Sequence, residues 1–147
     1  MIIRIEPMDI SRLDDVYGIE TRSFSVPWSF NEIKRDFTEN ENAVYFIALA
    51  DGAAAGYACM WHIVNEGHIN NIAVDEVYRR NGIASALMVQ LIETAKARGM
   101  IGLTLEVRVG NRAAMGLYHK YGFKAEGIRK NYYADTKEDA VIMWKYF

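Results

Sequence analysis

The sequence predicts an α+β fold, classed as α/β in some schemes, with a mixed central sheet of about seven strands and about four helices. Two features predict it. Short apolar segments separated by turn residues fill the first half of the chain and are typical of antiparallel strands. A long amphipathic helix then separates two further apolar segments, as in a parallel crossover. The length of 147 residues fits a single domain spanning residues 1–147.

The first helices and strands follow from local signals. Residues 2–6 alternate apolar and polar side chains, which predicts a strand. Asp9 or Ser11 can cap a first helix, and a capping box at residues 29–32 opens a second one. The strands expected next are residues 44–50, 53–64 and 68–74, with turns at Asp51-Gly52 and at Glu66-Gly67.

Residues 71–98 form the most informative stretch, because they predict a strand, a polar loop and a long helix in succession. Apolar residues recur at every fourth position from Ile83 to Ala95 and form one stripe of a helix. Gly99 is expected to end that helix. The apolar residues 101–108 are then expected to form a strand parallel to residues 68–74.

The junction between this loop and this helix suits an anion. The first backbone N–H groups of a helix have no partner and carry partial positive charge. Gly82 lacks a Cβ atom and Ala84 has a very short side chain, so an anion can approach the backbone, while Arg79 and Arg80 add positive charge. We therefore predict a pyrophosphate site. From Gly82 alone, a plain helix start beside two solvated arginines is an equal alternative.

An αβ unit of this kind binds its ligand at the carboxyl ends of the strands, which places the loop near residues 106–111. Asn111 is expected to cap a helix over residues 112–121. The connection over residues 130–138 is longer than a hairpin needs, and such loops often carry binding residues. The strands expected on either side of that connection are residues 123–129 and 139–146.

The composition argues against several classes of protein. The formal net charge of −2 gives no field for nucleic acid, and no apolar run is long enough to span a membrane. The amino terminus lacks a signal-peptide pattern and Cys59 is the only cysteine, so we expect a cytoplasmic protein. Cys59 lies inside a predicted strand and is interpreted as a core thiol. The three histidines lack ligand spacing, so no metal is expected.

Residues 79–84, Arg-Arg-Asn-Gly-Ile-Ala, fit the pattern Arg/Gln-x-x-Gly-x-Gly/Ala after a strand and at the start of a helix. This pattern resembles the acetyl-CoA motif of the GNAT N-acetyltransferases. The chain also resembles the RimI-type ribosomal-protein N-α-acetyltransferases of that family, most closely between His68 and Met143. The matching segments are Asn71–Asp75, Leu105–Arg108, Asn111, Leu117-Tyr118, Tyr121–Phe123, Arg129–Tyr133 and Glu138–Ala140, together with Pro27–Ser29.

The resemblance implies direct transfer of an acetyl group from acetyl-CoA to the α-amine of a protein N-terminus, with no covalent acetyl-enzyme. In the family, the acceptor is the N-terminal alanine of small-subunit ribosomal protein number eighteen. By matching positions, Glu106 is the general base and Tyr118 the general acid. The residues implied to hold acetyl-CoA are Ile72, Ala73, Val74, Arg79, Arg80, Asn81, Gly82, Ile83, Ala84, Ser85 and Asn111.

The chemistry of an α-amine fits these roles. Its pKa is about 7.7–8.0, against about 10.4 for lysine, so a carboxylate acting directly or through a water can take its proton. The edge of the strand can hydrogen-bond the pantetheine, and the backbone N–H of Val74 is the candidate oxyanion donor. The alternatives left open are a structural Glu106 paired with Arg108 or Lys124, a Tyr118 that belongs to the core, and His68 or Glu66 as the base.

Trp28, Glu66, Tyr132 and Tyr133 are predicted to contact the acceptor. The alternatives are that Trp28 simply fills the core, which its spacing favours at least as much, and that the loop of the two tyrosines is a solvated charged loop. The expected partners are acetyl-CoA and the N-terminal peptide of a ribosomal protein, with no direct nucleic-acid or membrane contact. The protein is expected to be a monomer or a weak dimer. Two other functions stay open: acetylation of another protein N-terminus or a small amine, and a non-catalytic acetyl-CoA-binding module.

Overall fold

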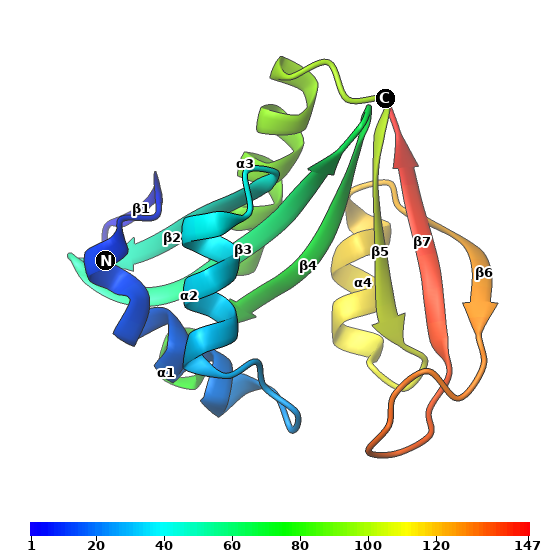
Figure 1. Ribbon diagram of the computed structural model, residues 1–147, viewed down its shortest axis with the longest axis horizontal. Helices are drawn as coiled ribbons and strands as arrows, with labels where there is room; N and C mark the ends of the chain where they lie inside the picture. The colour runs from blue at the N-terminus through cyan, green and yellow to red at the C-terminus, as the bar shows by residue number, and fades with distance from the viewer.

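One mixed sheet of seven strands, in the order β1-β2-β3-β4-β5-β7-β6, organises the molecule (Figure 1). The structure is a computed structural model that describes all of residues 1–147. The strands are β1 (Ile3–Pro7), β2 (Ala43–Ala50), β3 (Ala53–Ile63), β4 (Glu66–Val74), β5 (Gly102–Arg108), β6 (Lys124–Arg129) and β7 (Ala140–Tyr146). All neighbouring pairs are antiparallel except β4 and β5, which are parallel as predicted.

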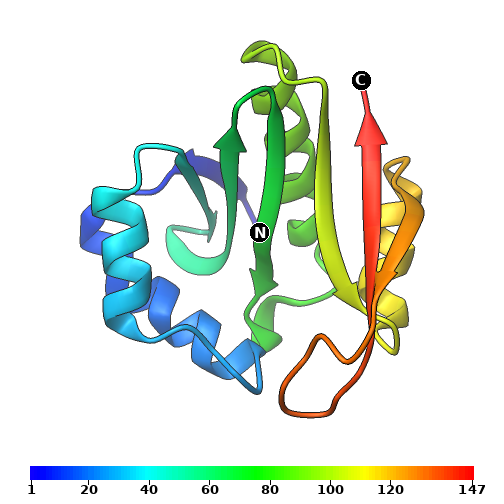
Figure 2. The same cartoon turned by 45° about the vertical axis from the view of Figure 1, so that its right-hand side comes forward.

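Four α-helices cover the two faces of this sheet (Figures 1 and 2). They are α1 (Leu13–Ser23), α2 (Phe30–Glu39), α3 (Ile83–Ala97) and α4 (Arg112–Lys120), with short 3-10 turns at Ile10–Arg12 and Glu76–Tyr78. The expected capping box is present, because the Ser29 hydroxyl accepts from the Glu32 N–H and the Glu32 carboxylate accepts from the Ser29 N–H. The helices and strands lie within a few residues of their predicted positions.

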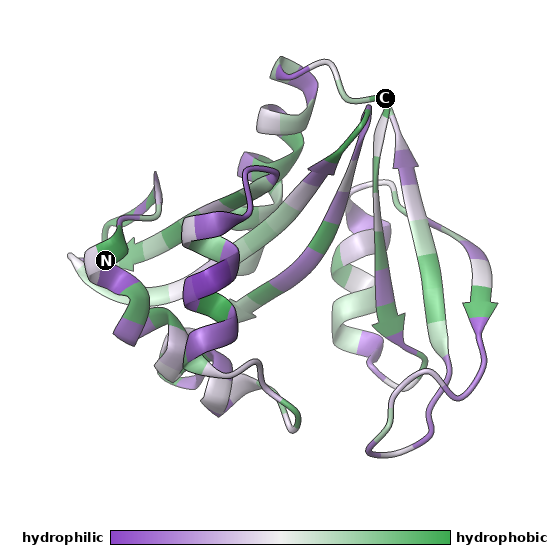
Figure 3. Ribbon diagram, in the orientation of Figure 1, coloured by the Kyte–Doolittle hydropathy of each residue, from purple (hydrophilic) through white to green (hydrophobic).

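The period-two alternation of β2 divides the core into two parts. Val44, Phe46 and Ala48 point to the face that α3 covers, whereas Tyr45 and Ile47 point to the face that α1 and α2 cover. In Figure 3, β2 is mostly coloured white to green, while β4 and β5 also carry hydrophilic bands and α2 is largely hydrophilic. Both faces of the central strands are therefore buried against helices, which fixes the register of the sheet.

Cys59 lies in the core beneath α1 and α2, as predicted. Its side chain is fully buried, and burial raises the pKa of the thiol to about 12. A thiol that keeps its proton at neutral pH is a poor nucleophile. The finding agrees with the interpretation of Cys59 as a structural residue.

The predicted turn at Glu66-Gly67 is wrong. The turn lies at Val64 and Asn65, where Val64 takes a positive φ of 55°, and β4 already begins at Glu66. Gly67 is needed for close packing instead, since a Cβ atom there would lie 2.5 Å from Leu103 Cδ2. The hairpin at Asp51-Gly52 is confirmed, with positive φ at both residues.

Candidate active site

The parallel strands β4 and β5 separate soon after they begin. They pair only through Gly67 with Leu103 and His68 with Thr104, and then diverge toward their carboxyl ends (Figure 1). The edge of β4 from Ile69 to Val74 consequently has no strand partner on the β5 side. Two cavities lie at this fork, and together they contain most of the residues that the sequence singled out.

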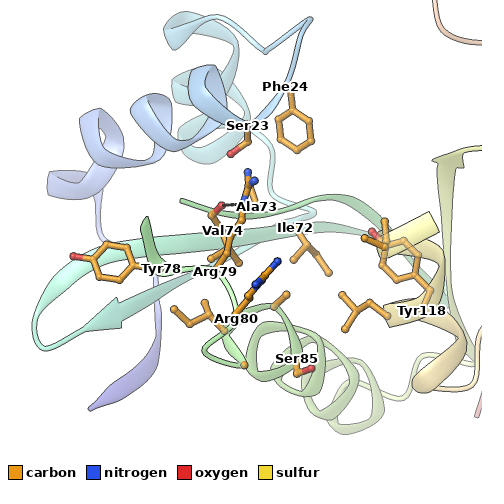
Figure 4. Close-up of a pocket in the computed structure, with 16 residues that line it drawn as sticks. Ser23, Phe24, Ile72, Ala73, Val74, Tyr78, Arg79, Arg80, Ser85 and Tyr118 are labelled. Carbon is orange, nitrogen blue, oxygen red and sulfur yellow. Dashed lines mark hydrogen bonds between the residues drawn. The ribbon is translucent and has the colours of Figure 1, made fainter. Parts of the chain in front are cut away.

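The first cavity, of about 420 Å³, lies between the end of β4, the following loop and the start of α3 (Figure 4). Of the predicted cofactor residues, those that line it are Ile72, Ala73, Val74, Arg79, Arg80, Gly82, Ile83, Ala84 and Ser85. Sequence reasoning missed the other side of the cavity, which consists of Ser23, Phe24, Tyr78, Ala113, Ala114 and Leu117. Ser23, Phe24 and the residues of α4 lie far from the loop in the chain, whereas Tyr78 directly precedes Arg79. The resemblance included Leu117 but assigned none of these residues to the cofactor.

The start of α3 has the features of an anion site. Gly82 caps the helix with a left-handed φ of 75° and no side-chain hydrogen bond, so the first backbone N–H groups stay free of a side-chain cap. No atom lies within 4 Å of the place where a Cβ of Gly82 would be. Figure 4 shows the Arg80 side chain extending from the loop toward Ile72. The end of the cavity near α3 therefore suits the phosphates of a cofactor.

Two of the predicted cofactor residues lie outside this cavity. The Asn81 amide donates to the carbonyls of Tyr78, at 2.9 Å, and Arg79, at 3.1 Å, so it holds the shape of the loop. Asn111 caps α4, where its carbonyl accepts from the Ala114 N–H at 3.1 Å, and it lines the second cavity instead.

The second cavity, of about 530 Å³, opens between β4 and β5 and contains the predicted chemistry. Glu106 lies in it together with Trp28, Tyr132 and Tyr133. Ser23, Phe24, Ile72, Ala114 and Tyr118 line both cavities, so the two spaces meet at Tyr118. Glu66 lines neither cavity, because it lies at the start of β4, opposite Ile63.

Glu106 is held by two cationic or potentially cationic side chains. Its Oε2 atom lies 2.6 Å from His68 Nε2, and its Oε1 atom lies 3.4 Å from Arg129 Nε. The hydrogen bond with His68 is the main cause that lowers the pKa of Glu106, and burial opposes it. Glu106 is therefore a carboxylate at neutral pH. Neither of its expected structural partners, Arg108 and Lys124, pairs with it.

Tyr118 is one of the residues that line both cavities. The ring packs against Phe123 at a centroid distance of 5.9 Å, and the hydroxyl has no hydrogen-bond partner within the protein. Burial raises the pKa of Tyr118 to about 12. The phenol consequently stays protonated across the neutral range and can donate a hydrogen bond to a group in either cavity.

One side of the second cavity is closed by a bridge between distant loops. The Arg108 guanidinium donates to both carboxylate oxygens of Asp135, at 2.9 and 3.0 Å, and lies 4.0 Å above the ring of Tyr133. Ser25 Oγ, from the loop between α1 and α2, donates to Asp135 Oδ2 at 2.6 Å. These contacts order the long loop between β6 and β7 over the cavity.

The loop that carries Trp28 is anchored by a buried carboxyl that sequence reasoning missed. Glu20 is 2% exposed, and it accepts from the backbone N–H of Trp28 at 2.9 Å. It also accepts from the Tyr57 hydroxyl and, at 3.1 Å, from the Asn71 amide. Burial raises the pKa of Glu20. The network fixes one wall of the second cavity through hydrogen bonds between α1, β3 and β4.

Comparison with known proteins gives a consistent result. The profile of the acetyltransferase (GNAT) family matches residues 13–123. The ribosomal protein bS18-alanine N-acetyltransferase of Escherichia coli strain K12 is 38% identical over 143 residues, covering 95% of this chain and 94% of that protein. The crystal structure of the ribosomal-protein-S18-alanine N-acetyltransferase from Escherichia coli has a TM-score of 0.91 at 35% identity, covering 99% of this chain and 94% of that one.

A structure from Bacillus anthracis in complex with acetyl coenzyme A has a TM-score of 0.82 at 25% identity, covering 100% of this chain and 99% of that one. In this chain, the fork between β4 and β5 and the uncapped start of α3 leave backbone N–H groups that can bind an anionic ligand. No helix of the structure has the length and hydropathy needed to cross a membrane. The chain belongs to the acetyltransferase (GNAT) family, and it is an acyltransferase that uses acetyl-CoA.

Proposed function

We propose that this chain acetylates the α-amine of a protein N-terminus, and that its acceptor is the N-terminal alanine of ribosomal protein bS18. The observation that carries the proposal is the meeting of the two cavities at Tyr118, with Glu106 in the acceptor cavity. The described activity of the Escherichia coli relative, which aligns over nearly the full length of both chains, supports the choice of acceptor.

The proposed reaction is a direct transfer within a ternary complex. The open edge of β4 binds the pantetheine amides, and the first turn of α3 together with Arg80 binds the pyrophosphate. The thioester then lies beside Tyr118, and the α-amine approaches from the cavity of Glu106. The amine nitrogen bonds to the carbonyl carbon, and the tetrahedral oxyanion accepts a hydrogen bond from the backbone N–H of Val74.

Proton transfer then completes the reaction. Glu106 takes the proton that the amine loses as it forms the new bond, directly or through one water. An α-amine suits this base better than a lysine does, because its ordinary pKa of about 7.7–8.0 leaves a fraction already uncharged at neutral pH. The carbon–sulfur bond breaks, and the Tyr118 hydroxyl donates a hydrogen bond to the departing thiolate. A thiol with an ordinary pKa near 8.5 needs little further help to leave.

The proposal places the whole activity in one domain, residues 1–147, that works in the cytoplasm as a monomer or a weak dimer. The acceptor peptide is its only macromolecular partner in this scheme, and it contacts Trp28, Tyr132 and Tyr133 in the second cavity. Glu66 has no part in it, since Glu66 lies outside both cavities.

The test is acetyl-CoA turnover with a panel of acceptors. The panel contains peptides that begin with alanine, serine and methionine, the alanine peptide with a blocked α-amine, and free polyamines. Wild-type protein is compared with Glu106→Gln and Tyr118→Phe. We expect only the free alanine N-terminus to react well, and Glu106→Gln to lower kcat by about a hundredfold or more while CoA binding is retained.

Other outcomes select other functions. Turnover with polyamines instead of peptides would replace the acceptor and keep the fold and cofactor site. Cofactor binding without transfer to any acceptor would favour the non-catalytic acetyl-CoA-binding module. A Glu106→Gln variant with wild-type kcat would remove Glu106 from the role of base.

A further inference from the structure

His68 lies at the point where the sheet divides. Its backbone makes the last parallel pair, with Thr104, before β4 and β5 separate, and Glu106 follows Thr104 by two residues on the same strand. The His68 imidazole can thus reach across the fork to Glu106, and its Nε2 atom lies 2.6 Å from Glu106 Oε2. The position of this contact is set by the topology of the sheet.

Few other charged groups lie next to His68 and Glu106. Arg129 of β6 reaches the other carboxylate oxygen, at 3.4 Å, and Tyr133 of the long loop lies near Glu106 without an ion pair. Trp61 of β3 faces the edge of the imidazole at a centroid distance of 6.5 Å and carries no charge. The His68 side chain is 27% exposed, whereas Glu106 is more enclosed at 16%.

We propose that His68 is a positioning residue for Glu106, and that acetyl transfer requires the imidazole to be neutral. The inference rests on the proposed role of Glu106 as the base. A neutral imidazole donates Nε2–H to Oε2 and leaves the remaining lone pairs of the carboxylate available to the amine. An imidazolium would form an ion pair with the same oxygen, and the added positive charge would make Glu106 a weaker base and repel the acceptor ammonium.

The proposal predicts the steepness of the acidic limb of the pH profile. Histidine is the side chain whose ordinary charge change falls between pH 5 and 8, and the acceptor amine titrates at about 7.7–8.0. A plot of log(kcat/KM) against pH should therefore fall more steeply on its acidic side in the wild type than in a variant whose donor at position 68 cannot be protonated.

The test compares this profile between the wild type, His68→Gln and a control, His62→Gln, with a peptide whose only titratable group between pH 5 and 9 is its α-amine. His68→Gln keeps a neutral donor that cannot be protonated, so its acidic limb should be shallower than that of the wild type. His62 is on β3 and lines neither cavity, so its variant should keep the acidic limb of the wild type.

Each outcome decides the question. Equal slopes in the wild type and His68→Gln would overturn the inference. Loss of all activity in both His68→Gln and His68→Asn, with CoA binding intact, would also overturn it, since a neutral donor would then not suffice. Failure of the proposed function is recognised separately, because Glu106→Gln would then retain wild-type kcat whatever His68 does.

Discussion

Burial sets the protonation state of Tyr118, the residue proposed as the acid. The Tyr118 side chain lines both cavities, and burial raises its pKa to about 12. A phenol with that pKa keeps its proton at every pH at which the enzyme is assayed. It can therefore always donate a hydrogen bond to a departing thiolate, and its own ionisation does not limit the reaction between pH 5 and about pH 10.

The first prediction concerns the Tyr118 hydroxyl. Tyr118→Phe should lower kcat by about tenfold or more, because the thiolate loses its donor, while the KM for acetyl-CoA changes little. The measurement is steady-state kinetics at pH 7 to 10. Because Tyr118 stays protonated over this range, kcat should vary with pH in the same way in the wild type and in Tyr118→Phe. Tyr121→Phe, at the end of the same helix, is the control and should behave as wild type. A Tyr118→Phe variant with unchanged kcat would contradict the role of acid.

Single residues also show where sequence reasoning stops. The parallel-strand topology predicted that Glu106 would lie near the cofactor loop, and the family resemblance pointed to Tyr118; in the structure Glu106 lines the second cavity and Tyr118 lines both. The partners of Glu106 could not be predicted, because His68 and Arg129 belong to strands β4 and β6, and neither lies near it in the sequence. The anchoring of Trp28 by Glu20 was missed for the same reason.

At the scale of elements, Gly82 affects both the backbone conformation at the start of α3 and the space around its first turn. Gly82 adopts a left-handed φ of 75° that a residue with a Cβ adopts at a cost, and it leaves the first turn of the helix open. Gly99, at the other end of the same helix, has almost the same φ, 73°, and also has open space around the Cβ position. The two glycines therefore differ mainly in what lies outside the helix.

The second prediction uses this pair. Gly82→Ala and Gly99→Ala should each lower the free energy of unfolding by about 1–2 kcal/mol through backbone strain, as measured by urea denaturation. Only Gly82→Ala should also raise the KM for acetyl-CoA several-fold, because its methyl group would lie where the phosphates approach the backbone. An equal effect of both variants on that KM would show that the start of α3 does not bind the cofactor.

Elements were predicted well where the signal is local. The Ser29 capping box and the Asp51-Gly52 hairpin follow from two to four neighbouring residues, and the structure confirms both. The prediction of a turn at Glu66-Gly67 was wrong because Gly67 lies inside β4, where the side chain of Leu103 from β5 packs closely against it. A local pattern cannot separate a glycine that turns the chain from one that makes room for another strand.

At the scale of the whole molecule, the acceptor cavity depends on a bridge between segments 110 residues apart in the chain, through Ser25 and Asp135. Arg108 holds the same carboxylate from β5. The pKa of Asp135 is lowered to about 2, first by Arg108 and then by Ser25. Because the pKa is lowered on folding, the bridge contributes fully above the ordinary value near 4 and is lost only as the pH falls through about 2.

The third prediction follows from this bridge. Asp135→Asn should raise the KM for the acceptor peptide several-fold, because the loop loses its charge pair with Arg108, while the KM for acetyl-CoA stays the same. Ser25→Ala removes one hydrogen bond and keeps the charge pair, so it should act in the same direction with a smaller effect. Between pH 5 and 9, the KM of Asp135→Asn for the acceptor peptide, divided by that of the wild type, should be constant. A change confined to the acetyl-CoA KM would assign the loop to the other cavity.

The overall fold was predictable because its order of elements is determined by a few strong signals, above all the helix that crosses between two apolar strands. The same signals predicted which end of the sheet carries the site. They could not predict how far β4 and β5 stay together, since that depends on the side chains packed between them, such as Leu103 against Gly67.

The early separation of β4 from β5 has a consequence for the molecule without its co-substrate. Amide hydrogens on the open edge of β4, between Ile69 and Val74, have no partner in β5 and should exchange with deuterium faster than those in the middle of β3. Addition of CoA should slow this exchange, while the exchange rates of the amides in β6 and β7 should not change. An unchanged exchange rate in β4 would contradict the proposed binding of the pantetheine to its edge. In the proposed complex the cofactor would take the place of a neighbouring strand along the part of β4 that β5 leaves unpaired.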